Sequence, residues 1–140
     1  MKKLILGLLL VNGAVFSSYA QCDKRVIIVS SVTEHIKGGE VERTKEETST
    51  IEFDSKEITI APGDDPAITG TIKSTTCEWK TPFKEGKSVI KATVTDPRGQ
   101  TFNITVTVEG KEGKISFLLE IEEQPDRKIR LQVDKFEEKK

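Results

Sequence analysis

Four consecutive segments in the second half of the chain alternate apolar and polar residues with a period of two. Their apolar members are Ile90, Ala92 and Val94; Phe102, Ile104, Val106 and Val108; Ile115, Phe117, Leu119 and Ile121; and Ile129, Leu131 and Val133. In an extended chain this period places successive side chains on opposite faces. Each segment is therefore predicted to be a half-buried β-strand, and together the four present one apolar face.

The residue types in the chain support an all-β fold. From residue 21 onward there are 15 Thr, 13 Ile and 9 Val, against only 3 Leu and 3 Ala. Branching at Cβ restricts χ1 and disfavours helices, whereas branched side chains pack well on a pleated sheet. The composition therefore predicts a domain with little or no helix.

Short polar connections join the four regular segments. Asp96-Pro97-Arg98-Gly99 has Pro at the second position of a turn and Gly at the fourth. Residues 109–113 and 123–127 are equally short and polar. None of these connections can hold a helical crossover, so neighbouring strands are predicted to pair antiparallel.

The first half of the chain is less regular. Strands are expected at 26–36, 51–53 and 58–60, with a hairpin turn at 37–40 and a loop at 61–66. Residues 41–50 are very polar and are compatible with a strand or a short helix, of which we favour the strand. Residues 68–74 and 77–80 are expected to form two strands or one broken strand, and the tail after Phe136 to be solvated.

About eight or nine strands joined in sequence form an up-and-down meander. Such a sheet buries its apolar face and its edges either by closing into a small barrel or by folding into a β-sandwich. Consecutive hairpins favour the barrel, since sandwiches usually need Greek-key connections. The arrangement resembles the ligand-binding barrels of the lipocalin and fatty-acid-binding class by analogy of fold. The first strand has no Gly-x-Trp motif, and the single tryptophan, Trp79, lies in mid-chain.

Residues 1–20 have the layout of a secretory signal peptide. Lys2 and Lys3 precede an apolar run of 13 residues, and Ser18 and Ala20 are small residues suitably placed for cleavage before Gln21. The run is shorter than the about 20 residues that span a membrane, so no membrane span is expected. We predict an exported protein, periplasmic or extracellular, with residues 21–140 as a single all-β domain.

The two cysteines, Cys22 and Cys77, are predicted to form a disulfide, because an exported protein reaches an oxidising compartment. A lipid-modified Cys22 is the alternative. Gln21 stands where lipoprotein signals require a small residue, so we do not favour lipoprotein anchoring.

Several function classes are disfavoured. Without Lys2 and Lys3 the chain has 20 basic and 23 acidic residues, a poor match for nucleic acid. His35 is the only histidine, no motif places a nucleophile beside it, and it is expected to be solvated near a hairpin tip. Asp64-Asp65 is interpreted as a turn and not as a metal site. We therefore predict a protein that is not an enzyme and has no cofactor.

Two functional hypotheses remain, and they depend on whether the interior is filled. A cavity would bind a small lipophilic molecule, and its candidate lining residues are Phe53, Trp79, Phe102, Ile104, Phe117 and Leu119. A filled interior would favour a structural module or an envelope protein that binds another protein through its outer face. For that second hypothesis the candidate is Leu118, an apolar residue on the polar face of its strand. The oligomeric state is not predicted.

Overall fold

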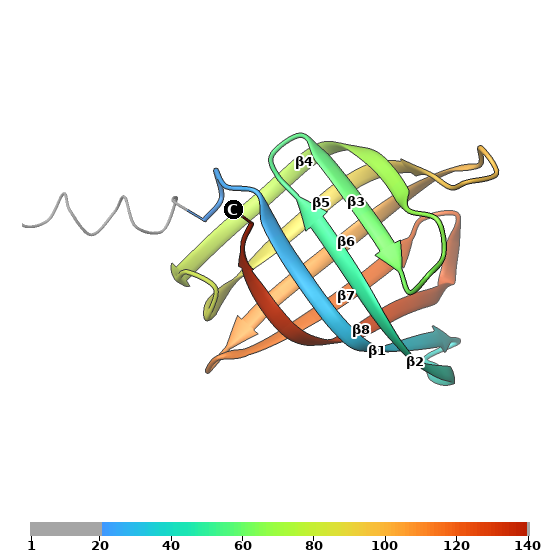
Figure 1. Cartoon of the computed structure of the whole chain (residues 1–140), viewed down its shortest axis with the longest axis horizontal. Helices are drawn as coiled ribbons and strands as arrows, with labels where there is room; N and C mark the ends of the chain where they lie inside the picture. The colour runs from blue at the N-terminus through green and yellow to red at the C-terminus, as the bar shows by residue number, and fades with distance from the viewer. Residues whose placement is uncertain (1–20, 140) are drawn as a thin grey trace, which may run out of the picture.

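The structure is a computed structural model, and it describes residues 21–139. It contains eight β-strands in a closed barrel (Figure 1). In chain order they are β1 (Val26–Lys37), β2 (Glu40–Phe53), β3 (Glu57–Pro62), β4 (Ile68–Thr81), β5 (Glu85–Thr95), β6 (Thr101–Lys111), β7 (Lys114–Ile121) and β8 (Gln124–Glu138).

Every strand pairs antiparallel with its neighbours in sequence, and β1 also pairs with β8 to close the barrel. Val26 marks this closure, because it lies opposite Phe53 on β2 and opposite Glu138 on β8. The predicted meander barrel is confirmed, and the alternative of a β-sandwich is wrong. Because β3 is short, residues 40–48 of β2 and 73–81 of β4 have a strand partner on one side only.

Three elements in the described chain are more continuous than the sequence indicated. The polar residues 41–50 belong to one long strand, β2, and residues 68–80 to another, β4. Residues 75–76, where a break was expected, pair regularly with β5, and the register of β4 shifts instead between Ile72 and Ser74. The last strand, β8, continues two residues past Phe136, because the backbone of this tail pairs with the start of β1.

Aspartates form two of the turns as the residue types require. Asp96 Oδ1 accepts hydrogen bonds from Arg98 N and Gln100 N at 2.9 and 2.8 Å, which confirms the predicted turn between β5 and β6. Asp54 Oδ1 does the same for Lys56 N and Glu57 N at 2.7 and 2.8 Å between β2 and β3. In both turns the carboxylate accepts hydrogen bonds from backbone N–H groups that have no strand partner.

The two ends of the barrel differ, and the end that contains the turns after β2, β4 and β6 is filled. There Trp79, 1% exposed, packs close to the backbone of two glycines. A Cβ added to Gly86 would lie 2.5 Å from the Trp79 Cα atom, and one added to Gly110 would lie 2.8 Å from its ring. Only glycine allows the indole so near both strands. We call this the closed end.

The N-terminal segment covers the closed end. Cys22 is bonded to Cys77 on β4, with 6.0 Å between their Cα atoms, so the predicted disulfide is confirmed. Gln21 is buried, and its Oε1 accepts a hydrogen bond of 2.6 Å from Phe83 N in the turn after β4. The ring of Phe83 in turn meets that of Phe136 at 4.9 Å. Both described chain ends therefore lie together at this end (Figure 1).

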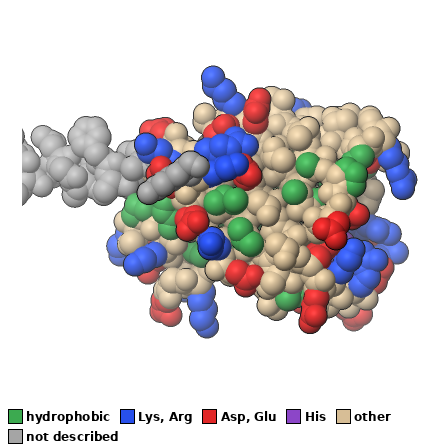
Figure 2. Space-filling model, viewed as in Figure 1, with side chains coloured by type: hydrophobic (Ala, Val, Ile, Leu, Met, Phe, Trp, Pro, Cys, Tyr) green, Lys and Arg blue, Asp and Glu red, His purple; other side chains and the backbone are tan. Residues whose placement is uncertain are grey.

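The outer surface is mixed in charge. Acidic and basic side chains are interspersed over the face shown in Figure 2, with apolar side chains between them. Val41 at the tip of the β1–β2 hairpin is a large apolar residue with 46% exposure. Residues 21–139 include no helix long and apolar enough to cross a membrane.

Candidate ligand-binding cavity

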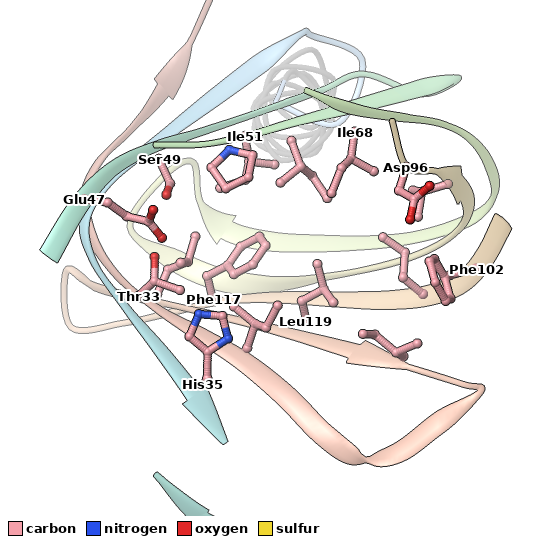
Figure 3. A pocket seen from close by; sticks show the side chains of 17 residues that line it. Thr33, His35, Glu47, Ser49, Ile51, Ile68, Asp96, Phe102, Phe117 and Leu119 are labelled. Atoms are coloured by element: carbon pink, nitrogen blue, oxygen red, sulfur yellow. The ribbon is translucent and has the colours of Figure 1, made fainter. Parts of the chain in front are cut away.

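The other end of the barrel, where the turns after β1, β3, β5 and β7 lie, contains a cavity of about 250 Å³ (Figure 3). We call this the open end. Its lining comes from all eight strands and the turn after β5: Thr33, His35, Glu47, Ser49, Ile51, Ile60, Pro62, Ile68, Val94, Asp96, Phe102, Ile104, Phe117, Leu119, Ile121, Ile129 and Leu131. The volume exceeds that of an engineered apolar cavity of about 150 Å³ that binds benzene. It therefore has room for a compact small molecule.

Most of the lining is apolar, as the alternation in the sequence led us to expect. Four of the six candidate residues, Phe102, Ile104, Phe117 and Leu119, line the cavity. Ile104, Phe117 and Leu119 are buried, and Phe102 is half-buried near the opening. These side chains form a continuous wall along β6 and β7.

Two candidate residues, Phe53 and Trp79, do not line this cavity. Both point inward, but they stand at the closed end, where β2 and β4 reach the N-terminal segment. Trp79 Nε1 donates a hydrogen bond of 2.7 Å to Ser88 Oγ, and its ring meets Phe136 at 5.5 Å. The period of two indicates on which face of the sheet a side chain lies. The position of that side chain along the barrel axis depends on strand register, so alternation alone does not tell which end of the barrel it occupies.

A β-bulge in β1 places polar side chains inside the open end. Val26, Ile28 and Ser30 point inward, and register shifts between Ser30 and Val32 affect the pairing with both β2 and β8. Beyond the bulge the inward positions are Thr33 and His35, both of which line the cavity. A bulge inserts an extra residue and so exchanges the two faces of the strand beyond it.

Ser30 stabilises the backbone of this bulge. Its hydroxyl donates to Val32 O at 2.9 Å and accepts from Val32 N at 3.3 Å. A serine can meet both requirements because its hydroxyl is a donor and an acceptor. The bulge therefore has a local cause in the sequence, although period-two analysis alone does not reveal it.

Two buried hydroxyl groups have no hydrogen-bond partner within the described chain, and both lie in the cavity lining. They are Thr33 Oγ1 and Ser49 Oγ, on residues that are 5% and 3% exposed. Figure 3 shows both oxygens on the same side of the cavity, together with the Glu47 carboxylate. Such groups are rare in folded proteins, and a ligand is one explanation for their retention.

Glu47 extends along the opening of the cavity. Its side chain is only 11% exposed, and Lys45 Nζ lies 3.4 Å from Oε1, with the Lys45 side chain itself 50% exposed. A Cβ added to Gly63 would stand 2.7 Å from the same Oε1. The carboxylate therefore rests on the loop after β3, where a side chain on residue 63 would displace it.

His35 is expected to be solvated, but it is half-buried, because the bulge directs it into the cavity lining. Arg43 Nη2 lies 3.3 Å from His35 Nε2, and a guanidinium can only donate, so Nε2 is the acceptor of a neutral ring. Burial lowers the pKa of His35 below its usual 6.5, and the nearby positive charge of Arg43 lowers it further. The ring of His35 is therefore protonated less readily than a free imidazole.

Asp96 lines the side of the cavity opposite the polar cluster (Figure 3). Its Oδ1 is already engaged by two backbone N–H groups of the turn. With Glu47 it supplies two carboxylates to the lining, and among the described residues no Lys or Arg lines the cavity. The cavity is thus apolar over most of its wall, with a polar and formally acidic opening.

None of the five polar residues of the lining is among the predicted site residues: Thr33, His35, Glu47, Ser49 and Asp96. Glu47 and Ser49 do share the odd-numbered phase of Ile51 and Phe53 on β2, a signal that could have indicated their inward direction. Leu118, the candidate for partner binding, is half-buried between Thr107 and Arg130 on the neighbouring strands.

Comparisons with protein-family models, with curated proteins and with solved structures found no match for this chain. Within residues 21–139 no group of three or more His, Cys, Asp or Glu side chains is arranged to hold a metal ion.

Proposed function

We propose that this protein is an exported, non-catalytic β-barrel that binds a small lipophilic molecule in the open end of its interior. The observation that carries the proposal is the cavity of about 250 Å³ beneath an opening formed by four hairpin turns. Small-molecule sites are typically concave, mostly apolar and supplied with a few polar groups that orient the ligand. The lining has this composition.

The division of the interior supports binding over a purely structural role. The closed end is filled by Trp79 and the residues around it, which gives the barrel a packed core. The open end is lined by large apolar side chains such as Phe102 and Phe117 that leave space between them. A module selected only for stability would gain from filling this space, since lost packing costs free energy.

Export is the setting we propose for this binding. The features of residues 1–20 that suggest a signal peptide lie outside the described residues, and the proposal of export rests on the sequence. The Cys22–Cys77 disulfide is compatible with an oxidising compartment such as a bacterial periplasm or the extracellular space. A small lipophilic molecule in such a compartment would be shielded from water by the barrel.

The proposal is tested by titrating the disulfide-bonded protein with cyclohexylmethanol, a compact apolar probe, while amide and methyl NMR signals are recorded. We expect shifts concentrated at lining residues such as Ile104 and Leu119. Ile129→Trp, which adds a ring to the lining, should abolish them. Gln132→Trp on the outer face of the same strand is the matched control and should leave them intact.

Native mass spectrometry of protein purified from its own host provides an independent measurement. A bound mass that is lost in Ile129→Trp and kept in Gln132→Trp would identify the natural ligand. A clean apo mass, together with no response of the lining residues to the probe, would refute ligand binding. The second hypothesis, partner binding at Leu118, gains no specific support because that residue is half-buried.

A further inference from the structure

We infer that the natural ligand carries a hydrogen-bond-donating polar end, a hydroxyl or an amine, which binds to Thr33, Ser49 and Glu47, while its apolar body lies against β6 and β7. The inference rests on the proposed function and specifies the chemical class of the ligand. It follows from three observations about the lining: its unpaired hydroxyl groups, its charge, and the placement of polar and apolar side chains on different sides of the cavity.

The first observation is the pair of buried hydroxyls without partners, Thr33 Oγ1 and Ser49 Oγ. A buried hydroxyl that makes no hydrogen bond destabilises the fold, and an alanine or valine in its place would avoid this penalty. Both side chains are in the same part of the lining and on adjacent strands. A polar end of a ligand in this part of the lining would supply hydrogen-bond partners that these hydroxyls lack within the described chain.

The second observation is the charge of the lining. Glu47 and Asp96 contribute carboxylates, the described lining contains no Lys or Arg, and His35 accepts a hydrogen bond from Arg43 as a neutral ring. Lys45, whose side chain is half exposed, forms an ion pair with Glu47 but does not line the cavity. A ligand carboxylate would meet Glu47 with no cation in the lining to compensate its desolvation. A hydroxyl or an ammonium group can instead donate to Glu47.

The third observation is the separation of polar and apolar groups. Figure 3 shows Thr33, Glu47 and Ser49 on one side of the cavity and Phe102 on the other, with Leu119 between them. Asp96 also lies on the Phe102 side, but its Oδ1 is engaged by two backbone N–H groups of the turn. The wall formed by β6 and β7 offers Phe102, Ile104, Phe117 and Leu119. An amphipathic ligand is thereby oriented, with its donor toward β1 and β2. A purely apolar molecule would leave both hydroxyls unsatisfied.

Four probes of matched shape test the inference by calorimetric or NMR titration at pH 7.5: methylcyclohexane, cyclohexylmethanol, cyclohexylmethylamine and cyclohexanecarboxylate. We expect the alcohol and the amine to bind about tenfold more tightly than the hydrocarbon, a difference of ~1.4 kcal/mol. The carboxylate, which is ionised at this pH, should bind more weakly than the alcohol.

Variants assign the effect to individual groups. In the double variant Thr33→Val, Ser49→Ala, the preference for the alcohol over the hydrocarbon should fall from about tenfold to twofold or less. Glu47→Gln should weaken the amine more than the alcohol, because it removes the charge-assisted bond. Thr107→Val, a similar substitution on β6 at a position that does not line the cavity, should keep the wild-type preferences.

The outcomes separate this inference from the function on which it rests. If none of the four probes perturbs the lining, ligand binding itself is refuted. If the hydrocarbon or the carboxylate binds as tightly as the alcohol, binding stands and the assigned ligand class is wrong. The wild-type comparison decides these cases without any variant. An unchanged preference in the double variant would show that Thr33 and Ser49 do not hold the polar end.

Discussion

The indole N–H of Trp79 donates a hydrogen bond of 2.7 Å to the hydroxyl of Ser88, and both residues are buried at the closed end of the barrel. Ser88 Oγ also lies 3.5 Å from Cys77 Sγ, so its hydroxyl can donate to the sulfur while it accepts from the indole. One small side chain thereby connects the single tryptophan to the disulfide.

Ser88→Ala should destabilise the protein by about 1–3 kcal/mol, because the buried indole N–H would lose its partner. The measurement is urea unfolding monitored by the fluorescence of Trp79, the only tryptophan in the chain. Ser74→Ala, an exposed position on β4, is the control and should change the free energy of unfolding by less than about 0.5 kcal/mol. Equal effects of the two substitutions would contradict the role of this hydrogen bond.

Removal of the disulfide by Cys77→Ser should lower stability by up to about 4 kcal/mol. The bond closes a loop with a sequence separation of 55, and this figure follows from the chain entropy that the closure removes from the unfolded state. The loss should appear first at β1, whose preceding segment is no longer held, as faster hydrogen exchange of Ile27 and Ile28. Uniform acceleration across β5 to β7 would argue against a local effect.

The exported protein should begin at Gln21, and its intact mass should show the loss of residues 1–20. This mass should lie about 2 Da below that of the reduced protein, since disulfide formation removes two hydrogens. Two titratable thiols in the native exported protein would contradict the pairing of Cys22 with Cys77 seen in the structure. A diacylglycerol mass on Cys22 would instead identify a lipoprotein and exclude that pairing.

Ser30→Ala should destabilise the β-bulge that directs Thr33 and His35 into the cavity. It removes both hydrogen bonds between the Ser30 hydroxyl and the backbone of Val32, with an expected cost of about 1 kcal/mol. Because the bulge directs His35 inward, the NMR signals of this single histidine should move toward those of a solvated ring. Ser31→Ala at the adjacent exposed position is the matched control, and His35 signals that respond equally to both would refute the role of Ser30.

The imidazole of His35 should titrate below pH 6.5, because burial and the charge of Arg43 both lower its pKa. When the pH falls through 6.5, the unfolded chain takes up the proton before the folded protein does. Stability should therefore decline from pH 6.5 until the folded pKa is reached, and then level off. NMR titration gives the pKa directly, since the chain has one histidine.

His35→Gln is the control for this pH dependence. It should abolish the part of the decline in unfolding free energy that falls between pH 6.5 and the folded pKa. Arg43→Gln should raise the pKa of His35 only in part, because burial is the larger cause. A wild-type pKa at or above 6.5 would contradict the dominance of burial and Arg43 over the neighbouring carboxylates.

The alternation from Phe102 to Val108 and the Asp96 turn illustrate what local sequence can predict. Both depend on residues close in the chain, on the period of two in a strand and on the hydrogen bonds of an aspartate in a turn. The cysteine pair was predictable for a different reason. With two cysteines in a chain expected in an oxidising compartment, only one intramolecular pairing exists.

The locations of Trp79 and His35 show where this reasoning fails. Alternation gives the face of each inward residue but not its height in the barrel. Trp79 is a candidate lining residue by its phase, yet it fills the closed end. His35 is expected in solvent because it lies near a hairpin tip. The bulge at Ser30 shifts the inward phase of β1 from even-numbered to odd-numbered residues, and this shift appears only in the pairing with β2 and β8.

The sequence by itself determined the all-β class, the antiparallel meander, the apolar inner face and the disulfide, because each depends on residue type and short-range periodicity. Only the tertiary structure decided that β1 meets β8, that one end is filled while the other holds a cavity, and that Thr33, Glu47 and Ser49 converge at its opening. Those features arise from the register between strands. Register is set by closure of the whole barrel, in which residues more than 100 positions apart, such as Val26 and Glu138, must lie side by side.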